Sequence, residues 1–357
     1  MLRRGWRALP PAAPQPPHDD DDEREEVDAA AEEEMDVDPG PLLFLCWNIL
    51  ADGLAQDGGF EGVEDEVLEW EHRLPLVAME LASAQADVVC LQEASRCFAR
   101  PADGGEAVWR GLDPVLAALG YDGMFAPKRP SPCERLGAPP DGVAILWKRN
   151  RCALASEPKV VYYPGENGTP MSQCYLVAHL ADTVYDEGAR LVTVVATHLK
   201  AKAENSATRV QQARYLCDAL RDLHASPPPW LSPDHGIHAL VVCGDLNDTP
   251  DSEAVRTLAN HDSPPLAAAW DPAAYPWTTW KTREGTTKKQ AIDHLFVVRG
   301  GPLVPLRTWS LPSADAVPPT GLPCASYPSD HVSVGAALAW RAYRVARGTP
   351  VLDALKS

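Results

Sequence analysis

Polar side chains that can bind a metal ion or move a proton recur where apolar, strand-like runs of this sequence end. In chain order they are Asn48, Glu93, His198, Asp245, Asn247, Asp293, Asp330 and His331. A side chain at the end of a strand is held by the rigid sheet behind it, which suits catalytic groups. The ordered series therefore indicates a catalytic site, although each member alone is an ordinary feature of folded proteins.

Taken singly, these residues also have purely structural interpretations. Glu93 fits a solvated turn residue, and His198 fits a strand-end histidine with satisfied hydrogen bonds. Asp245 and Asn247 fit an Asx-type turn before a helix. They also lie two residues apart, so they face one side of a continuing strand after Gly244 and suit a phosphate and its attacking water.

Short β-branched runs separated by Gly, Pro and Asp dominate the chain, a pattern typical of strands. We expect strands at residues 42–48, 87–93, 143–148, 175–180, 191–199, 239–245, 291–298 and 332–340. Helices are expected at residues 66–84 (with Pro75 as a kink or late start), 114–119 and 206–224. Many strands with few helices between them predict a single α/β catalytic domain, a two-layer β-sandwich flanked by helices, at residues 41–342.

Charge is distributed unevenly along the 357 residues. The 32 Lys and Arg against 50 Asp and Glu give a net charge of −18, of which −12 falls within residues 19–38. Residues 1–40 therefore predict a disordered, acidic and proline-rich tail, and residues 343–357 a C-terminal extension. The composition argues against a broad basic face for nucleic acid, DNA included, and no apolar run is long enough to span a membrane.

Cysteine usage and the N-terminal residues bear on the compartment. The nine cysteines form no C-x-x-C pair, and Cys46, Cys90 and Cys243 lie in apolar runs, so a reducing compartment is expected. We predict a cytoplasmic protein. A mitochondrial one is the alternative, because Arg3, Arg4 and Arg7 precede the first acidic residue.

The ordered series resembles that of the endonuclease/exonuclease/phosphatase superfamily, over residues 42–340. Finer features resemble its nocturnin branch, related to the poly(A) deadenylases. They are Trp47-Asn48-Ile49-Leu50-Ala51, Trp70-Glu71-x-Arg73, Gly120-Tyr121-Asp122-Gly123, Pro127-Lys128, Ser131-Pro132-Cys133, Pro140-Asp141-Gly142, His198-Leu199-Lys200-Ala201, Thr278-Thr279-Trp280-Lys281-x-Arg283 and Tyr327-Pro328-Ser329-Asp330-His331.

This resemblance implies a metal-dependent phosphoester hydrolase. Mg²⁺, with Mn²⁺ as the alternative, would be held by Glu93 and Asn48, with Asp330 near the metal ligands. His331 would be the general base, with Asp293 as its partner, and Asp245 would orient or deprotonate the attacking water. Asn247 would bind the transition state, and His198 would contact the phosphate or assist the leaving group.

The nocturnin branch implies a small-molecule substrate, NADP⁺ or NADPH, which would lose its 2′-phosphate to give NAD⁺ or NADH. The cations expected to bind it are Lys128, Lys200, Lys202, Lys281 and Arg283. Lys202 stands where nocturnins usually have Arg, and residues 285–290 are rearranged around Lys288 and Lys289. The alternatives are a 3′–5′ exoribonuclease of the deadenylase type, acting on RNA, and a non-catalytic binding protein.

Overall fold

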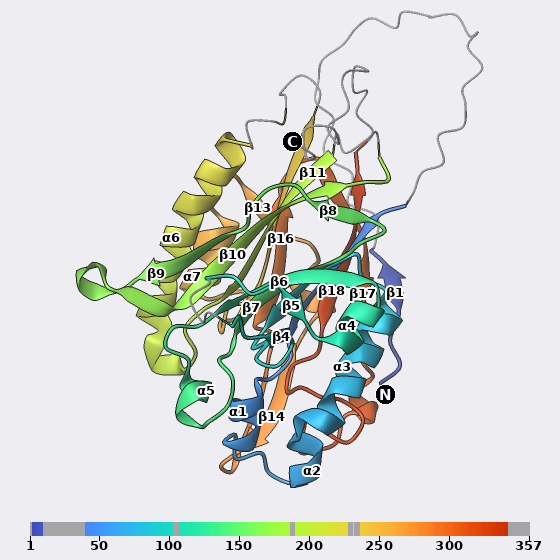
Figure 1. The fold of residues 1–357 in the computed structure, drawn as a ribbon, viewed down its shortest axis with the longest axis vertical. Coiled ribbons are helices and arrows are strands. Elements are labelled where there is room, and N and C mark those ends of the chain that lie inside the picture. The colour runs from blue at the N-terminus through green and yellow to red at the C-terminus, as the bar shows by residue number, and fades with distance from the viewer. Residues whose placement is uncertain are drawn as a thin grey trace, which may run out of the picture.

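The computed structural model describes residues 2–9, 40–102, 107–185, 190–227, 231 and 236–341. Two seven-stranded sheets pack face to face (Figure 1). The first sheet runs in the order β1 (Trp6–Ala8), β17 (Leu303–Trp309), β18 (Val334–Trp340), β2 (Leu42–Asn48), β3 (Val88–Gln92), β7 (Gly142–Lys148) and β6 (Tyr121–Pro127). The second runs β13 (Leu266–Ala268), β16 (Asp293–Val298), β12 (Ile237–Asp245), β11 (Arg190–His198), β10 (Pro170–Asp182) and β8 (Cys152–Leu154), with β9 (Lys159–Pro164) also paired to β10.

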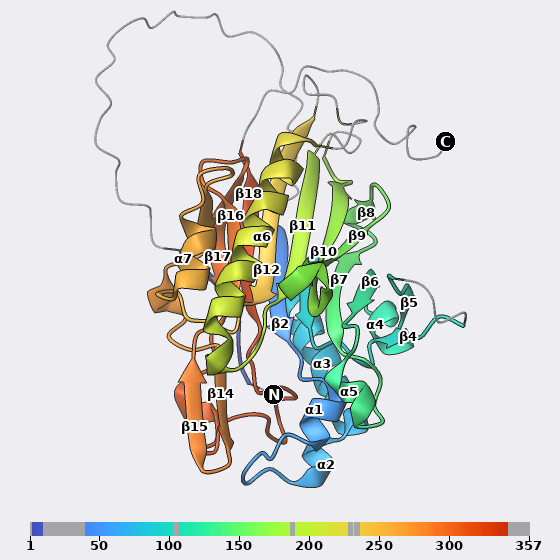
Figure 2. The same ribbon diagram turned by 90° about the vertical axis from the view of Figure 1, so that its left-hand side faces the viewer.

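Helices cover the outer face of each sheet, which explains why the central strands are apolar on both faces. Helix α3 (Trp70–Ala84) packs on the first sheet. Helices α6 (Ser206–Ala225) and α7 (Glu253–Ala259) pack on the second (Figure 2). Inward side chains of both sheets form the core between them. The predicted two-layer sandwich flanked by helices is confirmed.

Smaller elements complete the described chain. The short α-helices are α1 (Asp52–Gln56), α2 (Asp65–Leu68), α4 (Pro114–Ala118) and α5 (Pro132–Arg135), and 3₁₀ turns lie at Glu166–Gly168, Ala203–Asn205, Pro272–Ala274 and Ala314–Ala316. Two hairpins pair β4 (Phe98–Ala99) with β5 (Gly111–Leu112), and β14 (Thr279–Arg283) with β15 (Thr286–Gln290). The β14–β15 hairpin lies at the same end of the sandwich as α1 and α2 (Figures 1 and 2). No helix in the described part of the chain has the length and apolarity to cross a membrane.

Two sequence-based predictions need correction. The helix predicted at residues 66–84 is divided, because Glu69 takes extended dihedrals (φ −65°, ψ 140°) between α2 and α3. The prediction of a disordered tail over residues 1–40 is wrong for residues 2–9. There β1 pairs antiparallel with β17, and Leu2 is buried in the core beneath α3. The acidic residues 19–38 and the extension 343–357 lie outside the described residues.

Candidate active site

Strand register brings the predicted polar residues to one edge of the sandwich. Asn48 ends β2 of the first sheet and Asp245 ends β12 of the second, and Nδ2 of Asn48 donates to Oδ2 of Asp245, so these two strand ends meet at the same edge. His198 is the register partner of Asp245, which is in turn the partner of Asp293 on antiparallel β16. Strand β12 ends at Asp245 where antiparallel β16 begins at Asp293, so both carboxylates lie at the same edge of the sheet.

Gly244 is needed for the close contact of β11 with β12. A Cβ atom there would lie 2.6 Å from the carbonyl oxygen of Thr197. The sequence analysis noted this glycine only as the residue before Asp245. The structure shows its role, because the absent side chain leaves room for the neighbouring strand that carries His198.

Asn48 links the two sheets at this edge. Its Nδ2 donates to Oε1 of Glu93 at 2.9 Å and to Oδ2 of Asp245 at 3.0 Å. Oε2 of Glu93 also accepts from the backbone N–H of Ala51 at 2.9 Å. These contacts hold Glu93 in the left-handed region (φ 60°), an unfavourable conformation of the kind that persists where surrounding structure over-determines it.

Asp245 is buried at the centre of the cluster. Its Oδ1 accepts from the backbone N–H of Asn247 at 2.8 Å, and its Oδ2 lies 3.5 Å from Nε2 of His198 and 3.9 Å from Nε2 of His331. Burial, together with the nearby carboxylate of Asp293, raises the pKa of Asp245 to about 6. A carboxylate with that pKa can accept a proton near neutral pH more readily than an ordinary aspartate.

His331 and Asp293 form a buried pair. Nδ1 of His331 lies 2.8 Å from Oδ2 of Asp293, and the same oxygen accepts from Oγ1 of Thr278 at 2.5 Å. Burial lowers the pKa of His331, but the carboxylates of Asp293 and Asp245 outweigh it and raise the pKa to about 9. The two carboxylates therefore favour the protonated form of the imidazole.

His198 has the opposite electrostatic environment. Burial, together with the positive charges of Lys128, His331 and Lys281, holds the pKa of His198 well below its usual range. Nζ of Lys128 lies 3.5 Å from Nδ1 of His198 and pairs with Oδ2 of Asp141 at 2.6 Å. The neutral His198 ring can donate a hydrogen bond without carrying a charge.

Asp330 differs from its sequence-based assignment as a contact of the metal ligands. Its Oδ2 pairs with Nζ of Lys281 at 2.5 Å and with Nη2 of Arg283 at 3.4 Å. Burial raises the pKa of Asp330, but the charges of Lys281, His331 and Arg283 outweigh that effect and hold it well below the usual range. Asp330 therefore anchors two of the predicted substrate-binding cations on the β14–β15 hairpin.

A cavity of about 800 Å³ opens beside this cluster. Of the predicted site residues, Asn247, Lys202, Lys281 and Arg283 line it, and the lining also includes Arg209 and Lys288, to which the sequence analysis gave no role. Lys128 and Lys200 do not line it. Lys128 is buried, where it pairs with Asp141 and lies beside His198, and its contact with substrate stays a prediction.

Arg209 of α6 organises the loop that carries Lys200 and Lys202. Its Nη1 donates to the carbonyl oxygens of Lys200 at 3.0 Å and Lys202 at 2.7 Å, while Nε donates to Asp248 at 2.8 Å. Asn247, with φ of 52°, donates from Nδ2 to the carbonyl oxygen of Leu199. The sequence pattern placed Arg209 only on a helix and offered no signal for these contacts.

The oxygen-rich cluster fits a divalent cation. Ligand atoms of Asp245, Asp293 and His331 all lie within 4.8 Å of one another, and Oδ1 of Asp293 is buried with no hydrogen-bond partner among the described residues. Glu93 and Asp245 offer carboxylate oxygens, the ligands that Mg²⁺ prefers, whereas Asn48 turns Nδ2 toward these two carboxylates and its Oδ1 accepts from the backbone N–H of Leu50 at 3.0 Å. The assignment of Glu93 and Asn48 as metal ligands stays a prediction.

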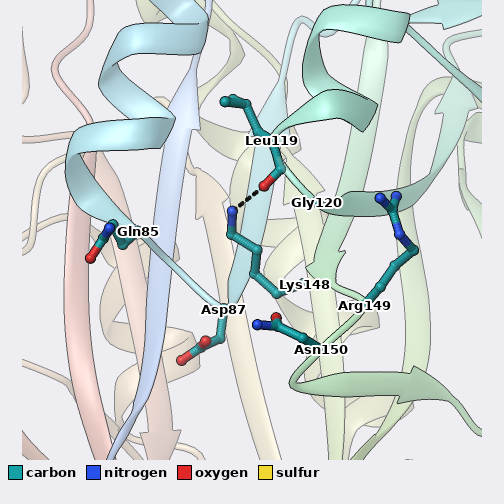
Figure 3. Close-up of a pocket in the computed structure, with 7 residues that line it drawn as sticks. All are labelled: Gln85, Asp87, Leu119, Gly120, Lys148, Arg149 and Asn150. Atoms are coloured by element: carbon teal, nitrogen blue, oxygen red, sulfur yellow. Dashed lines mark hydrogen bonds between the residues drawn. The ribbon is translucent and has the colours of Figure 1, made fainter.

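A separate cavity of about 490 Å³ lies at the other end of β3, around Asp87 and Lys148 (Figure 3). Its Lys148 side chain donates a hydrogen bond to the carbonyl oxygen of Leu119 and lies over the ring of Tyr121. The cavity contains none of the predicted site residues, and its lysine is already engaged by the protein.

Comparison with known proteins agrees with this geometry. Residues 45–331 match the Endonuclease/Exonuclease/phosphatase family. Nocturnin of Mus musculus is 29% identical over 303 residues, an alignment that covers 82% of this chain and 64% of that protein. This chain therefore spans less than two thirds of that relative's length.

Solved structures show the same fold. The human Nocturnin catalytic domain with bound sulfate anion superimposes with a TM-score of 0.64 and 25% identity, covering 84% of this chain and 95% of that one. ANGEL2, described as a 2′,3′-cyclic phosphatase, gives a TM-score of 0.66 at 18% identity over 95% of this chain and 98% of that one. At that identity the second likeness shows the fold alone.

Proposed function

The chain belongs to the endonuclease/exonuclease/phosphatase family, and from this premise we propose that it is a phosphoric ester hydrolase that removes the 2′-phosphate of NADP⁺ or NADPH with the aid of Mg²⁺. The products would be NAD⁺ or NADH and inorganic phosphate. The observation that carries this proposal is the cavity lined by Asn247, two residues after Asp245, whose volume of about 800 Å³ lies in the range of small-molecule sites.

The lining of that cavity favours a compact anion with several phosphates. The described residues that line it include five cations, Lys202, Arg209, Lys281, Arg283 and Lys288, against three acids, Asp57, Asp248 and Glu284, and no aromatic side chain. Proteins that bind single-stranded RNA commonly stack its bases on aromatic rings. Local cations without a stacking platform suit a dinucleotide better than an RNA strand, although RNA remains the alternative substrate.

Each buried residue has a role that follows from its contacts. Glu93 and Asn48, beside Asp245, would hold the cation, which when bound supplies positive charge to the phosphate oxygens. Asn48 links Glu93 to Asp245 and so sets their spacing. His198, neutral and 3.5 Å from Asp245, would donate a hydrogen bond to a phosphate oxygen.

We assign the proton acceptor to Asp245 in preference to His331. His331 is held between the carboxylates of Asp293 and Asp245, with Nδ1 bound to Asp293, and it already carries its second proton. An imidazolium there can stabilise negative charge that develops on the phosphoryl group. The sequence analysis expected His331 as the general base and Asp245 as the residue that orients or deprotonates the water; in this proposal Asp245 would take the proton of the attacking water.

The test uses the full chain with Mg²⁺ and either NADPH or oligo(A). Phosphate release from NADPH with intact RNA supports the proposal, and loss of that release in Asp245→Asn ties it to this site. RNA shortening without phosphate release from NADPH would establish the exoribonuclease alternative. Inertness toward both substrates in a folded, Mg²⁺-loaded protein would contradict the NADP(H) assignment.

A further inference from the structure

Residues 2–9 are attached to the catalytic domain through backbone and side-chain contacts. β1 pairs with β17 through Trp6–Ala8, and Gly5 exchanges hydrogen bonds with Ser310. Nε1 of Trp6 donates to the carbonyl oxygen of Ala84 at 3.1 Å, at the end of α3. This attachment places the side chain of Arg4 between α3 and the first sheet.

Arg4 meets a buried carboxylate there. Glu80 of α3 is fully buried, and its Oε1 forms an ion pair with Nη1 of Arg4. The same oxygen accepts from Oγ of Ser333 at 2.6 Å and from Nε1 of Trp309 at 3.2 Å. A buried carboxylate without a cation is costly, so Arg4 compensates a charge that α3 carries into the core.

The same guanidinium reaches both ends of the 327–333 loop, which carries Asp330 and His331. Nη1 of Arg4 donates to Oγ of Ser333 at 2.7 Å and lies 3.3 Å from the hydroxyl of Tyr327, while Nη2 donates to the carbonyl oxygen of Ser333. The loop is further closed because the Tyr327 hydroxyl accepts from the backbone N–H of Ser333 at 3.1 Å.

We propose that Arg4 is a positioning residue for His331. By joining Glu80 to both ends of the 327–333 loop, Arg4 fixes where that loop places the imidazole relative to Asp293 and Asp245. The proposal rests on the hydrolase site but not on the identity of its substrate. It gives the N-terminal residues a part in catalysis although they do not touch the substrate cavity.

Arg4→Met, Glu80→Gln and the double variant Arg4→Met/Glu80→Gln separate positioning from simple charge compensation. In the double variant the buried charge is gone, so we expect the melting temperature to recover relative to Arg4→Met. We expect kcat to stay at least tenfold below wild type with KM within about twofold, because the loop still lacks its contacts to Arg4. Arg7→Met, at an exposed position in β1, is the matched control.

A second measurement does not depend on any substrate. Amide hydrogen exchange of the peptide covering residues 327–333 should be faster in the double variant than in wild type and unchanged in Arg7→Met. The proposal is overturned if the double variant recovers its melting temperature and also shows the hydrogen exchange and kcat of wild type. Arg4 would then be only a counter-charge for Glu80. If Arg4→Met alone does not fold, the comparison of Glu80→Gln with the double variant decides the question.

Discussion

Nδ1 of His331 lies 2.8 Å from Oδ2 of Asp293, and both side chains are buried. The carboxylate fixes which nitrogen of the ring faces the protein, so Nε2 is left toward Asp245, 3.9 Å away. Asp293 is held in turn by Thr278. The orientation of the His331 ring, with Nε2 toward Asp245, is thus set by its contact with Asp293 and by the contact of Asp293 with Thr278.

Loss of either central group should abolish turnover without unfolding the protein. His331→Ala removes the charged imidazole, and Asp245→Ala removes the proposed proton acceptor, so each should lower kcat by several orders of magnitude. Steady-state kinetics with circular dichroism on the purified variants measures this. Near-normal turnover in both folded variants would refute the site assignment.

Thr278 should matter more than a neutral hydroxyl usually does. Thr278→Val removes the donor to Oδ2 of Asp293 and the acceptor for the N–H of Ile292. Leaving buried polar groups unsatisfied costs about 1–3 kcal/mol, and the displaced Asp293 should lower kcat about tenfold. Urea denaturation and kinetics measure the two effects, with Thr282→Val on the hairpin as control. A stability loss with unchanged kcat would show that Thr278 does not position the pair.

The strands that position the site were predictable because helices cover both sheets, which makes their sequences continuous apolar runs. The residues at the ends of these runs, from Asn48 to His331, could be picked out for that reason. The β14–β15 hairpin was missed because every residue of β15 is exposed and polar, so no apolar period marks it. Motif resemblance found Lys281 and Arg283 on that hairpin, but not the strands that present them.

The other features that the sequence did not predict depend on contacts between residues far apart in the chain. Arg4 and Ser333 are separated by 329 residues, and no local pattern joins them. Asp330 precedes His331, yet its side chain meets Lys281 and Arg283 and not the proposed metal ligands. Lys128 was predicted as a substrate-binding cation, and the sequence does not show that its side chain lies between Asp141 and His198.

Lys288 should determine affinity for the substrate and not the rate of the chemical step. It pairs in register with Lys281, and both line the cavity. Lys288→Ala should therefore raise KM for NADPH about three- to tenfold with kcat within twofold, by removing a cation that acts on ground and transition states alike. Lys289→Ala is the matched control, because that ammonium lies 3.6 Å from the ring centroid of Trp280 and does not line the cavity. Equal KM changes in the two variants would argue against a specific contact.

Acid should destabilise the domain through a histidine cluster far along the strands from the site. Oγ1 of Thr193 lies 2.8 Å from Nδ1 of His179 and 2.7 Å from Nε2 of His238. Burial, then the nearby His179 and His224, lower the pKa of His238 to about 4. Above pH 6.5 both folded and unfolded forms keep this histidine neutral. Between pH 6.5 and 4 only the unfolded chain binds the proton, so stability is lost as pH falls.

The size of this loss and its origin can be measured together. The lowered pKa of His238 corresponds to a loss of about 1–3 kcal/mol in the free energy of unfolding between pH 6.5 and 4. Urea denaturation at pH 7, 6, 5 and 4.5 measures this loss. His238→Gln keeps an amide that can bond Thr193 but cannot titrate, so its stability should fall less steeply with acid than that of wild type. His261→Gln, outside the cluster, should retain the wild-type slope. If His238→Gln and His261→Gln show the same acid slope, the destabilisation comes from other groups, with the buried His198 and His294 as the next to be replaced.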